Sequence, residues 1–303
     1  MADNKKKQKS GINPNAKFRI INLETETRID PLEADEAEEL AVIQSVPEAP
    51  PQNPALSKGW RLKMSEAEVL SVMERAKFGV YKLIPWGSNY TFLAALRDEA
   101  NDGTEYAVVY KPMKGEAPLW DFPSGTLYRR EQAAYVVSRA LDWNFIPPVI
   151  IRDGPHGVGT VQLFIDVDEQ AEFHTFGQKH AHELKRIAVF DMITNNADRK
   201  AGHCLLGFDD FIWGIDHGLC FNTVPKLRTI IWDYSGQPFP DDIYEDLFNF
   251  ATDAGRVSKL QDELADLLDR REVELLFRRL EQILETPVFP SFNSRRQIPW
   301  GFF

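Results

Sequence analysis

The 303-residue chain has only two cysteines and no long apolar run. Cys204 and Cys220 lie among apolar residues without C-x-x-C spacing, so we predict two buried free thiols, as suits a reducing cytoplasm. No stretch approaches the ~20 apolar residues that span a bilayer, so no integral membrane association is expected. MADNKKKQKS at the N-terminus is basic, but no apolar run follows, which argues against a secretory signal. We therefore predict a cytoplasmic protein.

Signatures of several common enzyme classes are also missing. The chain has no H-E-x-x-H or Cys-His zinc spacing, no G-x-S-x-G elbow and no Walker A string. These absences argue against a zinc hydrolase, an α/β-hydrolase and a P-loop enzyme. The formal net charge of -11 argues against a nucleic-acid partner, because phosphate backbones are bound by clustered Lys and Arg.

The composition is that of a folded protein, with 43% hydrophobic and 27% charged residues. Residues 1–58 differ, because a basic start is followed by an acidic run and then by Pro-rich sequence. We predict a disordered tail there, with FRIINLE at 18–24 as a candidate strand. We divide the remaining chain into an N-terminal lobe, 59–168, and a C-terminal lobe, 169–303.

The N-terminal lobe has the pattern of a small antiparallel sheet. Ser65 followed by Glu68 forms a capping-box signature that starts a short helix. Alternating apolar and polar residues predict strands within 78–98 and 105–112, separated by an NDGT turn. A helix over 126–142 and a hairpin over 147–165 complete the predicted lobe.

The C-terminal lobe is more helical. The sequence predicts a helix from His180 to Asn196, a short strand pair around CLLGF and IWGID, and helices at 240–254 and 257–286. Together the two parts predict an α+β fold, with a sheet lobe and a mainly helical lobe.

Two acidic residues in the C-terminal lobe have the spacing of a phosphoryl-transfer site. Asp198 and Arg199 follow a strongly predicted helix, and Asp216 comes eighteen residues after Asp198, before a glycine at 218. Phosphoryl transfer requires metal-binding carboxylates, a cation for the phosphates and a residue that orients the acceptor. Carboxylates at the ends of adjacent hairpin strands could converge on one metal–nucleotide complex.

The string D-x-I-x-N-N-x-D-R followed by I-D-H-G resembles the catalytic and metal-binding loops of phosphatidylinositol 3- and 4-kinases. It is most similar to the type II 4-kinases and their uncharacterised bacterial relatives, and more distantly to HipA-like protein kinases. The resemblance covers about residues 75–245. It implies a protein-kinase-like two-lobed fold and an ATP-dependent kinase, with 59–168 as the nucleotide-binding lobe and 169–303 as the catalytic lobe. It also implies that Asp198 and Arg199 are catalytic residues, with Asp198 orienting or deprotonating the acceptor, and that Asp216 binds Mg²⁺ or Mn²⁺.

The same resemblance assigns nucleotide-binding roles in the sheet lobe. Lys111 would contact the phosphates, with Glu131 as its helix partner. Gly87, Ser88 and Asn89 would cover the phosphates. The segment 162–169 would be the adenine-contacting linker, and Trp232, Asp233 and Tyr234 would lie in an activation segment that shapes acceptor access. Simple turns and surface salt bridges are the alternative interpretations of these residues.

One position departs from the family pattern. His203 stands five residues after Asp198, where these kinases usually carry a metal-binding Asn. Mg²⁺ prefers oxygen ligands, so His203 could bind another metal, contact phosphate as a cation, belong to a one-metal enzyme or mark a pseudokinase. Asn195 and Asn196 could supply an amide oxygen instead.

Three functions remain open from the sequence. The first is an active kinase whose unidentified acceptor is a protein or a soluble small molecule, since a lipid kinase would show a basic or apolar surface for the membrane. The second is a nucleotide-binding pseudokinase with a regulatory role. The third is transfer of another part of the nucleotide, such as AMP.

Overall fold

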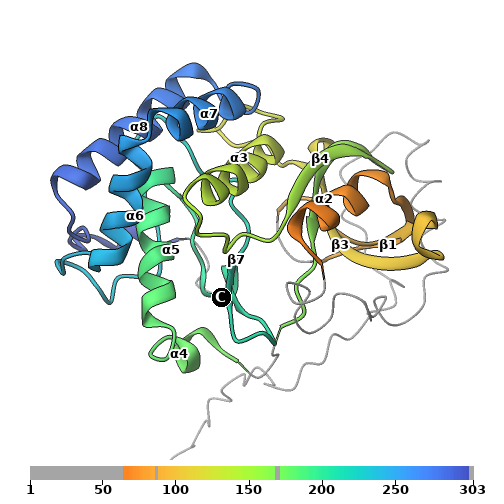
Figure 1. Cartoon of the computed structure of the whole chain (residues 1–303), viewed down its shortest axis with the longest axis horizontal. Helices are drawn as coiled ribbons and strands as arrows, with labels where there is room; N and C mark the ends of the chain where they lie inside the picture. The colour runs from red at the N-terminus through yellow and green to blue at the C-terminus, as the bar shows by residue number, and fades with distance from the viewer. Residues whose placement is uncertain (1–63, 86–87, 168–170, 300–303) are drawn as a thin grey trace, which may run out of the picture. The chain divides into compact units, whose positions relative to one another are not determined.

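The computed structural model describes residues 64–85, 88–167 and 171–299 (Figure 1). The predicted tail over 1–58, including the candidate strand at 18–24, lies outside these ranges. Within them, no helix has the length and apolar content needed to cross a membrane. Cys204 and Cys220 are buried free thiols, as predicted.

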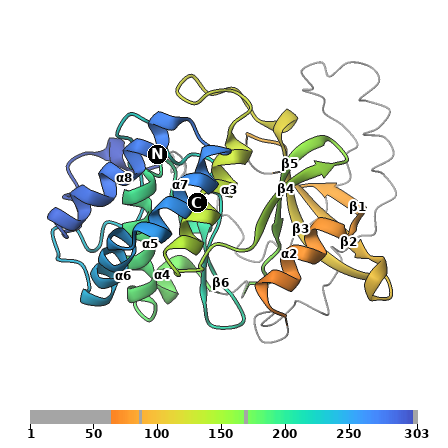
Figure 2. The same ribbon diagram turned by 45° about the horizontal axis from the view of Figure 1, so that its top comes forward.

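The first lobe is built on a five-stranded antiparallel sheet with the strand order β1-β2-β3-β5-β4. One helix, α2, precedes the sheet and packs on it (Figure 2). The bounds are α2 (Glu66–Arg75), β1 (Lys77–Leu83), β2 (Phe92–Asp98), β3 (Thr104–Pro112), β4 (Val149–Gly154) and β5 (Gly157–Leu163). The predicted strands and hairpin are therefore confirmed.

The start of α2 has the predicted capping box. The Ser65 hydroxyl accepts a hydrogen bond from the backbone N–H of Glu68, and the Glu68 carboxylate accepts the backbone N–H of Ser65. Two N–H groups that have no partner within the helix are satisfied in this way. The apolar face of α2, with Val69, Val72 and Met73, is buried in the core of the sheet lobe.

Side chains along β3 alternate between the core of the sheet lobe and the opposite face of the sheet. Tyr106, Val108 and Tyr110 are buried in the sheet-lobe core that includes α2. Successive side chains of a strand point to opposite faces, so Lys111 lies on the other face. Thr160 of β5 is directly opposite Lys111 and shares that face.

The close approach of β5 to β3 requires a glycine beside Lys111. A Cβ added at Gly159 would lie 2.3 Å from the carbonyl oxygen of Lys111. We expect Gly159→Ala to push the strands apart and to cost about 1–3 kcal/mol of stability, which lowers Tm by roughly 2–4 °C per kcal/mol. Calorimetric unfolding measures this. Gly79→Ala is the control, because its Cβ would meet Ala95 at an ordinary 3.6 Å; an equal loss in both variants would contradict the expectation.

The second lobe is mainly helical and carries one short hairpin (Figure 1). Its elements are α4 (Phe173–Phe176), α5 (Ala181–Thr194), β6 (Cys204–Leu206), β7 (Ile212–Gly214), α6 (Asp241–Thr252), α7 (Ala254–Ala265) and α8 (Arg270–Glu285). Over the described part of the chain, short 3₁₀ turns also occur in the first lobe, η3 (Glu99–Asn101) and η4 (Met113–Gly115), and in the second, η5 (Ala201–His203) and η6 (Arg295–Gln297).

The prediction of one helix over 257–286 was wrong. The structure has two helices there, α7 and α8, and α7 already begins at Ala254. Asp253 caps α7 by accepting the N–H groups of Gly255 and Arg256. Asp269 caps α8 in a capping box with Glu272. An N-cap residue lies outside helical geometry, so Asp269 ends any continuous helix.

Helix α3 (Leu127–Ala140) joins the two lobes. Its side chains at Ala134, Val137 and the following Leu141 belong to the large core of the helical lobe. Its contacts with β4 and β5 tie it to the sheet as well. The helix predicted to pack on the sheet lobe therefore contributes its buried face mainly to the other lobe. The described chain is an α+β fold with a small antiparallel sheet lobe and a mainly helical lobe.

Candidate active site

Lys111 is the centre of a three-residue ion-pair cluster. Its Nζ lies 3.2 Å from Oε2 of Glu131 on α3 and 3.1 Å from Oδ1 of Asp216 after β7. Burial alone would lower the pKa of Lys111, but the two carboxylates outweigh it and raise the pKa above its ordinary value. Lys111 is therefore held as a cation where three elements meet.

Glu131 also fixes the loop that carries Asp216. Its Oε2 accepts the backbone N–H of His217 at 3.1 Å. Glu131 is 2% exposed, and its Oε1 is buried with no hydrogen-bond partner among the described residues. Helix α3 thereby positions Lys111 and the Asp216 loop relative to each other.

Asp216 has an unusual backbone and a strongly acidic side chain. Its φ is 59°, in the left-handed region that non-glycine residues rarely adopt. Such strain costs of order 1–3 kcal/mol and is concentrated at functional sites. Lys111 is the main cause of a lowered pKa at Asp216, with desolvation by the surrounding protein acting in the opposite sense. The side chain is half-exposed and ionised, as a metal ligand requires.

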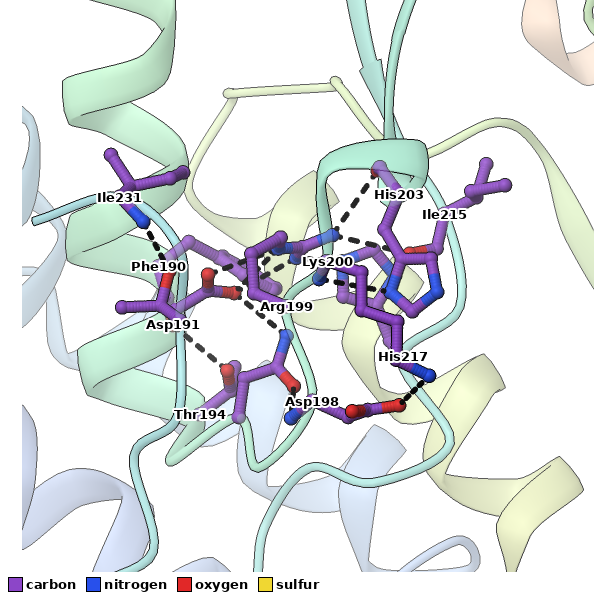
Figure 3. A network of polar contacts seen from close by, with 12 residues as sticks. Phe190, Asp191, Thr194, Asp198, Arg199, Lys200, His203, Ile215, His217 and Ile231 are labelled. Carbon is purple, nitrogen blue, oxygen red and sulfur yellow. Dashed lines mark hydrogen bonds and ion pairs between the residues drawn. The ribbon is translucent and has the colours of Figure 1, made fainter. Parts of the chain in front are cut away.

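Asp198 lies on the loop that follows α5. Its backbone N–H donates to Oδ1 of Asn196 at 3.0 Å, and its Oδ2 lies 3.0 Å from Nζ of Lys200 (Figure 3). Burial raises the pKa of Asp198, Lys200 opposes this effect, and the charge of Asp216 adds to it. The raised pKa favours proton acceptance compared with an ordinary surface aspartate.

Arg199 points away from Asp198 into the helical lobe. Its guanidinium donates three hydrogen bonds of 2.8–3.2 Å to Asp191 of α5, and both side chains are 0% exposed (Figure 3). It also donates to the carbonyl oxygens of His203 and Ile215, at 3.3 and 3.1 Å. Arg199 therefore ties the Asp198 loop to the Asp216 loop without facing the site itself.

His217 completes the buried network around Arg199. Its Nε2 lies 2.7 Å from the Arg199 guanidinium, and burial holds the pKa of His217 well below its ordinary value. The ring is therefore neutral, with Nε2 as the acceptor. A second buried cation beside Arg199 is avoided in this way.

His203 contacts Asp216 as a neutral ring. Its Nε2 lies 3.3 Å from Oδ2 of Asp216, and burial lowers the pKa of His203 to about 4. The backbone N–H of Lys200 donates to Nδ1 at 3.4 Å, which places the ring proton on Nε2. In this tautomer Nε2 has no lone pair for a metal, so the contact favours an orienting role. That His203 binds metal stays a prediction.

The predicted phosphate-covering loop is only partly described. Gly87 lies outside the described residues. Ser88 is exposed, and Oδ1 of Asn89 accepts the backbone N–H of Ala117 at 2.8 Å. Asn89 thus anchors the loop to the segment after β3.

Two further predicted segments contact the helical lobe. Val167, in the predicted linker 162–169, forms a β-bridge with Gly207 next to β6; residues 168–170 are not described. In the predicted activation segment, Trp232 contacts Phe292 at a ring-centroid distance of 5.4 Å. A C-terminal stretch therefore packs against this segment.

Two buried side chains beside Lys111 offer unpaired polar atoms. Oγ1 of Thr160 and Nε2 of Gln162 are buried and have no hydrogen-bond partner among the described residues. Alternation along β5 places both on the Lys111 face. An unpaired buried polar group costs about 1–3 kcal/mol, so this face suits a polar ligand.

The carboxylates fit a divalent metal that is held partly by a nucleotide. Among the described residues, no three His, Cys, Asp or Glu side chains form a metal-holding group. Mg²⁺ at kinase sites uses one or two carboxylates together with phosphate oxygens rather than an all-protein cage. Asp216 and Asp198, which interact electrostatically, are such a pair.

Sequence reasoning missed three residues of this site: Asp191, Lys200 and Arg228. Lys200 stands two residues after Asp198, so the sequence already places a positive charge near that carboxylate. Asp191 lies in the recognised string, but its pairing with Arg199 depends on the turn after α5. Nothing in the sequence indicated Arg228, whose backbone pairs with Asn196 and Arg199 in the loop that carries Asp198.

The sheet lobe, the helical lobe and the site between them define a two-lobed kinase-like fold. The structure of hydra Fam20 with sugar matches 72% of this chain and 87% of its own, with 15% identity and a TM-score of 0.50. The Helicobacter pylori proinflammatory kinase CtkA matches 71% of this chain and 94% of its own, with 11% identity and a TM-score of 0.45.

Sequence comparison places the chain with a mycobacterial protein. It is 39% identical over 230 aligned residues to Protein Rv2133c of Mycobacterium tuberculosis (strain ATCC 25618 / H37Rv), and the match covers 64% of this chain and 82% of that protein. The chain therefore belongs to the same family as Protein Rv2133c. No family model matches it. The closer relation to phosphatidylinositol 3- and 4-kinases and to HipA-like kinases stays a prediction.

Proposed function

We propose that the chain is a kinase that transfers the γ-phosphoryl group of ATP to a hydroxyl acceptor. The observation that carries this proposal is the joint contact of Lys111 with Glu131 and Asp216. A strand lysine, a helix glutamate and a loop aspartate are the groups with which kinases hold phosphates and metal. The proposed cofactor is ATP with Mg²⁺ or Mn²⁺.

Each side chain has a role that its surroundings support. Lys111 contacts the α- and β-phosphates, and Glu131 keeps it oriented. Asp216 would hold the divalent ion, which would supply positive charge to the transferred phosphoryl group. Asp198, with its raised pKa, accepts the proton of the acceptor hydroxyl. Arg199 acts as a positioning residue because its side chain is fully buried.

Nucleotide binding without turnover is the second candidate. The observation that favours it is His203, which contacts Asp216 where related kinases carry a metal-binding Asn. Product analysis distinguishes the candidates. ADP formation identifies γ-phosphoryl transfer, pyrophosphate release identifies AMP transfer, and binding without either product identifies the pseudokinase.

Removing the positive charge of Lys111 tests the nucleotide site. We expect Lys111→Met to weaken ATP binding by about 10- to 100-fold, because a charged hydrogen bond is worth about 1.5–3 kcal/mol. Isothermal titration calorimetry with Mg²⁺ or Mn²⁺ measures the affinity. Lys114→Met is the matched control, since Lys114 is exposed just after β3. Equal affinity in both variants, or no metal-dependent binding by the wild type, would overturn the assignment.

A further inference from the structure

Arg228 is paired through its backbone with the loop that carries Asp198. Its N–H donates to the carbonyl oxygen of Asn196 at 2.9 Å, and its carbonyl oxygen accepts the N–H of Arg199 at 3.0 Å. The N–H of Ile230 donates to the carbonyl oxygen of Arg199 at 3.1 Å. These bonds form a parallel bridge in which Arg199 lies opposite Thr229.

The bridge places the Arg228 side chain beside Asp198. Arg199 and Thr229 both point into the helical lobe and are 0% and 3% exposed. Neighbouring side chains on paired extended segments point to the opposite face, and such segments lie about 4.7–4.9 Å apart. Asp198 and Arg228 therefore project side by side on the opposite face of the paired segments. The two side chains interact electrostatically.

The positive charge of Arg228 acts on Asp198 but forms no ion pair within the described structure. The neighbouring lysines are paired, Lys200 with Asp198 and Lys226 with Asp121. Among the described residues, no carboxylate lies within 4.0 Å of the Arg228 guanidinium, and its side chain makes no hydrogen bond. The residue is half-buried, in a chain whose net charge is -11. A partly exposed guanidinium without an ion-pair partner is available to an anionic ligand.

We propose that Arg228 binds an acid group, a phosphate or a carboxylate, on the acceptor molecule. This inference rests on the proposed kinase function and narrows its acceptor to hydroxyl compounds that carry a negative charge. A planar guanidinium can form two parallel hydrogen bonds to either acid group. Because Arg228 stands beside Asp198, it would hold the acid group while Asp198 faces a nearby hydroxyl.

Small acceptor probes test this proposal in the full chain. The protein is first saturated with a magnesium complex of a non-hydrolysable ATP analogue, so that added anions cannot occupy the γ-phosphate position. Glycerol, glycerate and glycerol 3-phosphate are then titrated separately by calorimetry. We expect at least one acid to bind more tightly than glycerol, and Arg228→Ala to weaken that binding at least tenfold. Arg228→Lys keeps the charge without the planar guanidinium, so its affinity for the acid should lie between those of the wild type and Arg228→Ala.

Arg278→Ala is the matched control. It removes the same charge from an exposed α8 position with no ion pair among the described residues, and it should leave all affinities unchanged. The acid that binds identifies phosphate or carboxylate as the recognised group. If the analogue binds but neither acid exceeds glycerol, or if Arg228→Ala binds the acids as the wild type does, the proposal is overturned. If the analogue itself fails to bind, the proposed function falls, and this inference falls with it.

Discussion

Asp198→Asn is expected to lower phosphoryl transfer by about 10²- to 10⁴-fold, the range that a positioned general base contributes. The carboxylate makes one ion pair, with Lys200, and remains partly exposed. An amide of the same shape cannot accept the acceptor proton, but it keeps most of the local packing. Single-turnover formation of ADP measures the loss, and calorimetry on the same samples measures nucleotide affinity.

The control for Asp198 removes a carboxylate of the same size elsewhere. Asp262 is an exposed residue of α7, so Asp262→Asn should leave transfer and affinity unchanged. In Asp198→Asn we expect the rate of phosphoryl transfer to fall much more than the affinity for the ATP analogue. A wild-type rate in Asp198→Asn would remove this residue from the proposed chemistry. A parallel loss of rate and affinity would instead indicate that it acts mainly in metal binding.

Much of the fold was predictable because its signals are local. Period-two alternation predicted the strands around Lys111, and the Ser65–Glu68 capping box predicted the start of α2. The break between α7 and α8 was missed because Leu267 and Leu268 continue the helical spacing of apolar residues. Asp269 acts as a cap only in the folded backbone, and a pattern of apolar positions does not contain that information.

The candidate site was also only partly predictable from the sequence. The convergence of Lys111, Glu131 and Asp216 follows from residue spacings that the resemblance already implied. The direction of Arg199 does not, because a charged residue beside Asp198 was more naturally expected to face the substrate. Its burial depends on the distance from the loop to Asp191 of α5, and the place of Arg228 depends on a parallel pairing between separate loops. Non-local contacts of this kind are not encoded in a short window of sequence.

Breaking the buried Arg199–Asp191 pair is expected to cause a large loss of stability. Both side chains are 0% exposed, so Arg199→Met leaves an uncompensated carboxylate in the core of the helical lobe. Removing one partner of such a pair costs about 3–5 kcal/mol. At roughly 2–4 °C per kcal/mol for a domain of this size, Tm should fall by about 10 °C. Differential scanning calorimetry measures the change.

Two comparisons separate a buried-charge effect from simple loss of an arginine. Arg270→Met removes an exposed ion pair with Glu274 on α8, and such pairs are worth about 0–1 kcal/mol. Combining Arg199→Met with Asp191→Leu removes the stranded carboxylate, so part of the lost Tm should return. If Arg199→Met lowers Tm no more than Arg270→Met does, the Arg199–Asp191 pair does not stabilise the loops around the site. Recovered Tm without recovered phosphoryl transfer would show that Arg199 also positions Asp198 for the reaction.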